Sequence, residues 1–145
     1  MKRAFLVAAV SLFVAVGLSG CPGVACFGID SCQIQGRWHT SVVDLLGFSH
    51  DIYLTFQDGA FLYEGPAAFP TEGGLLYSGD SGTYSIKAGK RPRQIDITVV
   101  RGDDSRTWLG IYELSGDVLQ VQLGTDTLRP DALVLKDSWT LTRVQ

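Results

Sequence analysis

The 145-residue sequence has few of the residue types on which catalytic and metal sites depend. It contains only two histidines, His39 and His50, and none of its serines lies in a Gly-x-Ser-x-Gly nucleophile elbow. No phosphate-binding loop is present. Two of its three cysteines, Cys26 and Cys32, have no histidine close by and fall short of a four-ligand zinc site. We therefore expect a protein that is not an enzyme and that needs no cofactor or metal.

Positive charge is also scarce. Twelve Lys and Arg residues stand against 15 Asp and Glu residues, which gives a net charge of −3. Nucleic acids and anionic membranes are bound through clustered Lys and Arg, so the acidic balance predicts no nucleic-acid partner. One basic run, consisting of Lys87, Lys90, Arg91 and Arg93, crosses a predicted hairpin turn. We interpret it as a solubilising surface, with contact to an anionic headgroup or polymer as the alternative.

The only long apolar run lies at the start of the chain. Lys2 and Arg3 precede residues 4–18, which are apolar apart from Ser11 and Gly17. A positive start followed by such a run is typical of a secretory signal peptide. The run is shorter than the roughly 20 residues that a helix needs to cross a bilayer. It therefore predicts a cleaved signal rather than a permanent membrane-spanning helix.

The leader ends at Leu18-Ser19-Gly20-Cys21. A leucine, two small residues and a cysteine in this position resemble the lipobox of bacterial lipoproteins. The resemblance implies that residues 1–20 are removed and that the Cys21 thiol carries diacylglycerol, with a further acyl chain such as palmitate on the new amino end. Such chains hold a domain at the membranes of the cell envelope, inner or outer. The alternative is an ordinary signal peptide followed by a chance cysteine.

Residues 21–34 are predicted to form a tether between this lipid and the folded domain. Cys26 and Cys32 remain as an even pair in a compartment that permits disulfides, so they are expected to form one. Two free thiols are the alternative.

The domain at 35–145 is predicted to be all-β. No stretch after residue 35 shows a sustained helical apolar period, so helical crossovers are not expected and the strands should be antiparallel. Eight strands, or nine if Asp137 splits the last region, should hide their edges by closing into an up-and-down barrel, with a sandwich as the alternative. The predicted strands are 36–43, 52–57, 60–64, 81–87, 94–101, 106–114, 118–123, 132–136 and 139–144, with a loop at 65–80 that holds a short extra strand at 75–78.

Two motifs carry a family resemblance for this domain. Gly36-Arg37-Trp38 resembles the Gly-x-Trp opening of lipocalin-like barrels. The block Gly110-Ile111-Tyr112-Glu113-Leu114 resembles an uncharacterised lipocalin-like family abundant in planctomycetes, which also tends to carry the pair seen here as Arg129-Pro130. The resemblance implies a small barrel without an established enzymatic activity. It also implies that Arg143 lies over Trp38, beside Gly36, and closes one end of the barrel.

The loop at 65–80 departs from the pattern of that family, which usually has a tight hairpin there. Its apolar residues Phe69, Leu75, Leu76 and Tyr77 are expected to border the barrel mouth. Our first hypothesis is that this mouth accepts a small apolar ligand or the side chains of a partner. The alternative is a structural or interaction protein of the envelope with a solid core and no small-molecule ligand.

Overall fold

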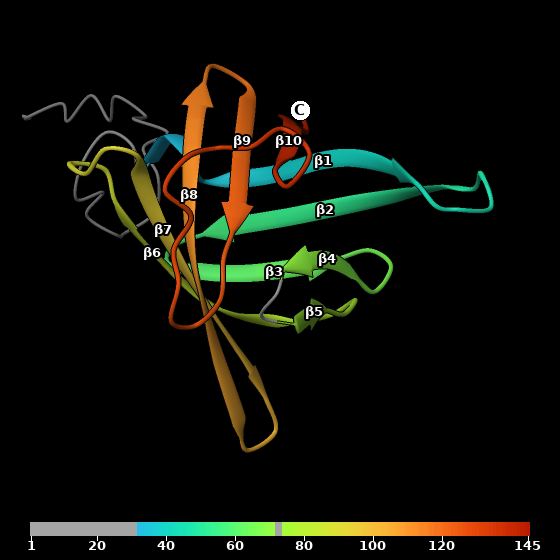
Figure 1. Cartoon of the computed structure of the whole chain (residues 1–145), viewed down its shortest axis with the longest axis horizontal. Helices are drawn as coiled ribbons and strands as arrows, with labels where there is room; N and C mark the ends of the chain where they lie inside the picture. Colours follow the sequence, from blue (N-terminus) through green and yellow to red (C-terminus); the bar gives the residue numbers. More distant parts are fainter. Residues whose placement is uncertain (1–31, 72–73) are drawn as a thin grey trace, which may run out of the picture.

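The computed structural model describes residues 32–71 and 74–145 (Figure 1). The predicted leader, Cys21 and Cys26 lie outside these residues. No helix in the described part is long and apolar enough to cross a membrane. The described strands are β1 (Gly36–Val43), β2 (Ser49–Gln57), β3 (Ala60–Glu64), β4 (Ala68–Thr71), β5 (Gly74–Leu76), β6 (Ser81–Lys87), β7 (Arg93–Arg101), β8 (Asp104–Ser115), β9 (Val118–Leu123) and β10 (Trp139–Arg143).

Eight of these strands close into a barrel in the order β1-β10-β9-β8-β7-β6-β3-β2, and all neighbours are antiparallel. Strands that follow each other in the chain lie side by side, except that β4 and β5 form a separate two-stranded sheet between β3 and β6. The barrel closes where Trp38 of β1 pairs with Arg143 of β10. The predicted antiparallel up-and-down barrel of eight strands is confirmed, and the sandwich is excluded.

Alternating apolar residues produce this fold. In β7, Ile95, Ile97 and Val99 are buried while Asp96 and Thr98 between them are partly exposed. Successive side chains of a strand point to opposite faces, so one face of β7 supplies the interior. Between β2 and β3, Asp58 and Gly59 have φ values of 50° and 83°, the left-handed conformation that a tight hairpin needs.

Large apolar side chains fill the barrel interior. Phe56 lies with its ring centroid 5.6 Å from that of Phe61 and 4.9 Å from that of Tyr84. The buried Trp38 donates its indole N–H to the Ile34 carbonyl at 2.7 Å, so this polar group is satisfied. The buried core members, each at most 6% exposed, are Ile34, Trp38, Ile52, Leu54, Phe56, Phe61, Tyr63, Leu76, Ile95, Ile97, Val99, Trp108, Tyr112, Leu119, Val121, Leu123 and Leu141.

The predicted strand at 132–136 is wrong. These residues belong to the long connection between β9 and β10, and the barrel closes without them. The Val134 amide donates to the side chain of Gln122 at 2.8 Å instead of entering a β-ladder. Strand β9 already pairs with β8 and β10, and β10 already pairs with β9 and β1. Residues 132–136 therefore have no free strand edge to join, even though most of them are apolar.

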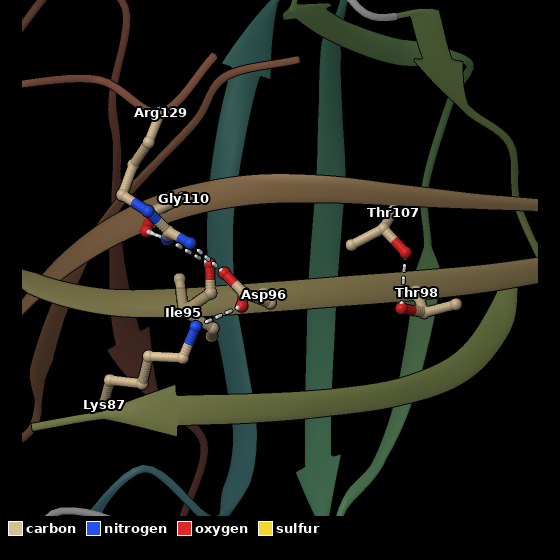
Figure 2. Close-up of polar contacts among 7 residues, drawn as sticks. All are labelled: Lys87, Ile95, Asp96, Thr98, Thr107, Gly110 and Arg129. Carbon is tan, nitrogen blue, oxygen red and sulfur yellow. Dashed lines mark hydrogen bonds and ion pairs between the residues drawn. The ribbon is translucent and has the colours of Figure 1, made fainter. Parts of the chain in front are cut away.

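This connection is fastened to the outer face of the barrel by Arg129 (Figure 2). The Arg129 guanidinium donates to the Ile95 carbonyl at 3.3 Å, to the Gly110 carbonyl and to the Asp96 carboxylate. Lys87 contacts the same carboxylate at 3.1 Å. The arginine of the Arg-Pro pair thus joins β7 and β8 to the connection, and Lys87 links β6 to the same carboxylate, which is a structural role.

Candidate functional site

The barrel end at which β1 begins is closed. The guanidinium carbon of Arg143 lies 4.2 Å from the centroid of the Trp38 ring, in the place that the lipocalin-like resemblance implied. Its nitrogens donate to the carbonyls of Gln33 and Gln35 and to the Asp117 carboxylate. Gly36 has a φ of 125°, and a Cβ built on it would lie 2.7 Å from Arg143 Nη1. Close packing at Gly36 therefore lets Arg143 cover the Trp38 ring at this end.

Of the residues predicted to border the barrel mouth, Leu76 and Tyr77 lie in different surroundings. Leu76 is 1% exposed and belongs to the core, whereas Tyr77 is 48% exposed. Arg101 lies over the Tyr77 ring, with its guanidinium carbon 4.7 Å from the centroid. The backbones of Phe69 and Leu75 lie in β4 and β5, but their side chains are outside the described part of the structure.

An ion pair between the buried Asp80 carboxylate and the partly exposed Arg101 fixes the loop at 65–80 to the barrel. Asp80 accepts hydrogen bonds from Arg101 and, at 2.7 Å, from the Tyr77 amide. Burial alone would raise the pKa of Asp80, but these hydrogen bonds and the charge of Arg101 outweigh it, so the pKa lies below its usual value. The same bond raises the pKa of Arg101. Tyr63 packs nearby, and its burial and the Asp80 charge raise its pKa to about 12.

Two pockets among the described residues lie on the outside of the barrel. One of about 440 Å³ lies beside the β9-β10 connection and is bordered by polar and charged groups that include Thr125, Arg129, Asp131, Lys136 and Asp137. Another of about 310 Å³ lies between the β6-β7 turn and the end of β8. Both have mixed walls, to which Leu123, Leu128 and Pro130 contribute in the first and Pro92, Tyr112 and Leu114 in the second.

Both histidines lie on the surface and pair with carboxylates. His39 Nε2 lies 2.9 Å from Asp51 Oδ1, and the same oxygen accepts the Ser41 hydroxyl at 2.7 Å. The Ser41 proton is thus directed to the carboxylate, and the serine oxygen is 3.5 Å from the imidazole. In a nucleophilic triad the imidazole instead bridges the serine and the carboxylate. The described residues contain no group of three or more potential metal ligands.

The most unusual surface feature is the far end of the β1-β2 hairpin. Within the described part of the chain, β1 pairs only with β2 beyond His39, and β2 pairs only with β1 before Tyr53. The two strands therefore leave the barrel as a ribbon, which projects to the right in Figure 1. At its end Leu45 is fully exposed, and Leu46, Val43 and Phe48 are 82%, 69% and 64% exposed. We call these four residues the apolar tip.

Asp44 gives the apolar tip a defined conformation. Its Oδ1 accepts the amides of Leu46 at 2.8 Å and Phe48 at 2.9 Å, while its own amide donates to the Phe48 carbonyl at 2.9 Å. The Asp44 Oδ2 lies 2.9 Å from His50 Nε2. The hydrogen bond from His50 and those from the two amides lower the pKa of Asp44. Gly47, with a φ of 86°, completes the turn.

Sequence reasoning did not single out the apolar tip. A signal was available, because Leu45-Leu46-Gly47-Phe48 places three large apolar residues inside a hairpin connection, where turns are usually polar. The length of β1 and β2 beyond the barrel, which carries these residues into solvent, depends on strand register and could not be derived from the pattern alone.

The remaining predicted residues are the cysteines of the tether and the basic run. Cys32 is disulfide-bonded, while Cys21 and Cys26 are outside the described residues. In the basic run, Lys87 pairs with Asp96 at 3.1 Å and Arg91 donates to the carbonyls of Ala88 and Lys90.

Compared with protein families, with curated proteins and with solved structures, the chain shows no match.

Proposed function

We propose that this protein is a lipid-anchored, non-catalytic β-barrel that acts through its outer surface at the cell envelope. The observation that carries the proposal is the filled interior. Barrels that carry small ligands keep room for them between the strands, whereas here Trp38, Trp108, Tyr63 and Tyr112 each expose at most 1% of their surface within it. Of the two hypotheses raised by the sequence, the interaction protein with a solid core is therefore favoured over the apolar-ligand carrier.

The surface offers further support for an interaction module. Monomeric proteins rarely keep several large apolar side chains together in solvent without a use for them. The apolar tip does so on a hairpin whose turn is ordered by Asp44. A non-catalytic role is supported by the two histidines, because His39 and His50 pair with Asp51 and Asp44 in the partly exposed surface of the β1-β2 hairpin and not in an enclosed site.

The anchor is tested by replacing the predicted lipid attachment site. We expect the unaltered chain, expressed in bacteria, to sediment with membranes and its Cys21 to carry diacylglycerol by mass spectrometry. The Cys21→Ser chain should lose this modification and should retain residues 1–20. A matched Cys26→Ser chain should still be lipidated and processed. Processing of the Cys21→Ser chain at the same bond, or an unmodified Cys21 in the mature wild-type protein, would contradict the proposed anchor.

A further inference from the structure

We propose that the apolar tip inserts into the apolar layer of a lipid bilayer whose headgroups are electrically neutral. The inference deepens the proposed function and rests on it, because the proposed lipid anchor is what brings the protein to a membrane. It names lipid as a surface that the barrel contacts directly, in addition to any acyl chains on Cys21. Three properties of the tip favour lipid over a protein groove.

The first property is its shape. Val43, Leu45, Leu46 and Phe48 stand at the end of a two-stranded ribbon that has left the barrel. A narrow projecting end can enter a bilayer without bringing the barrel with it. The large exposed fractions also mean that these side chains contribute little to the fold, so their apolar character is not explained by folding.

The second property is the hydrogen bonding of the tip backbone. An amide that enters hydrocarbon without a partner is costly, because lipid offers none. Here the amides of Asp44, Leu46, Gly47 and Phe48 all donate to acceptors within the turn, at 2.8 to 3.0 Å. The turn can therefore leave water with these four donors already satisfied.

The third property is the distribution of charge. The sequence has no Lys or Arg between Arg37 and Lys87, so the tip has no basic residue beside it in the chain. Asp44 and Asp51 are the nearest charges in sequence, and each lies 2.9 Å from a histidine nitrogen. Anionic headgroups are attracted by clustered basic residues, which the ribbon lacks. Insertion should accordingly depend on apolar burial, and neither anionic lipid nor low salt should be required.

The anchor and the tip can reach the same membrane. Strand β1 begins at Gly36 and ends at Val43, eight residues that span about 26 Å. The chain from Cys21 to Ser31, which precedes the folded residues, can extend to at most about 40 Å. A lipid on Cys21 therefore permits the β1-β2 ribbon to bring its tip to the bilayer surface.

Photolabelling from within the bilayer tests this inference. The full chain, isolated from the membranes of expressing cells, is reconstituted into phosphatidylcholine vesicles that contain a phosphatidylcholine with a photoreactive acyl chain. Adducts are then mapped by mass spectrometry. We expect them on residues 43–48, in equal yield when half of the lipid is phosphatidylglycerol and when salt is raised. The Leu45→Ser/Leu46→Ser chain should lose about tenfold or more of this labelling, because each replacement removes a large apolar side chain from the buried set.

The matched control is Leu128→Ser/Leu135→Ser, which removes two leucines that are 64% and 79% exposed on the β9-β10 connection. Its tip labelling should equal that of the unaltered chain, and both doubly substituted chains should keep the same melting temperature. No label on residues 43–48, equal label in the Leu45→Ser/Leu46→Ser chain, or label that needs phosphatidylglycerol would overturn the inference. So would a tip that crosslinks to a protein in cells while remaining unlabelled by lipid. The mass of the amino-terminal peptide in the same sample reports separately on the anchor.

Discussion

At the scale of single residues, Arg143 and Arg129 hold the barrel together by contacts made mainly to backbone carbonyls. Arg143 joins the first described residues to β10, and Arg129 joins the β9-β10 connection to β7 and β8. The position of Arg143 over Trp38 could be anticipated, since the Gly-x-Trp motif of lipocalin-like barrels implies it. The partners of Arg129 could not, because Asp96 and Gly110 lie far away in the sequence and only barrel closure brings them together.

The Asp80-Arg101 pair should make stability depend on pH. The pKa of Asp80 is lowered in the folded protein, against about 3.9 when unfolded. The pair therefore adds stability above about pH 4, and this contribution is lost as the pH falls through the folded-state pKa. We expect the urea midpoint of the wild-type protein to fall between pH 5 and pH 2, and to fall less in an Asp80→Asn variant.

The control for this prediction is Asp103→Asn, which removes a carboxylate from the exposed β7-β8 turn. It should keep the wild-type dependence of the urea midpoint on pH. An Asp80→Asn variant whose midpoint falls as steeply as that of the wild type would show that the ion pair does not stabilise the fold.

At the scale of strands, β6 and β7 approach closely enough to require a glycine. A Cβ built on Gly82 would lie 1.9 Å from the Thr98 carbonyl oxygen, which is backbone and cannot move aside as a side chain could. We expect Gly82→Ala to lower the free energy of unfolding by about 3 kcal/mol, as overpacked sites do. The measurement is urea denaturation, or recovery of soluble protein if the variant does not fold.

Gly89→Ala is the matched control, because a Cβ at Gly89 meets nothing within 4 Å. It should change the free energy of unfolding by less than about 0.5 kcal/mol. Equal stability of the two variants would mean that β6 and β7 are not packed as closely as described.

Strand positions could be predicted where alternation and turn residues agree. The bounds of β1, β3, β6 and β9 match the predicted ranges, and the Asp58-Gly59 turn lies where its composition indicates. The strand predicted at 132–136 was wrong. Alternation shows which side chains could share a face of a strand, but it does not show whether a partner strand is free to pair. The β4-β5 sheet was only half anticipated, as the predicted strand at 75–78 had no predicted partner.

At the scale of the whole molecule, the fold class could be predicted but the content of the barrel could not. Short antiparallel strands without helical segments favour a closed barrel, although a sandwich has the same pattern, and neither conclusion depends on which residues face inward. Whether eight strands enclose a cavity depends on side-chain volumes and on how each end is covered. Here Ile34 and Leu76, which come from outside the eight barrel strands, add to the aromatic core.

The central claim is that side chains fill the interior of the barrel and that the protein acts through its outer surface. Native mass spectrometry of the full chain, released gently from the membranes of expressing cells, tests it most directly. We predict the mass of the processed polypeptide with the lipid on Cys21 and no additional small molecule. A reproducible extra mass that corresponds to one apolar compound per chain, and that persists in the Cys21→Ser chain, would contradict the account.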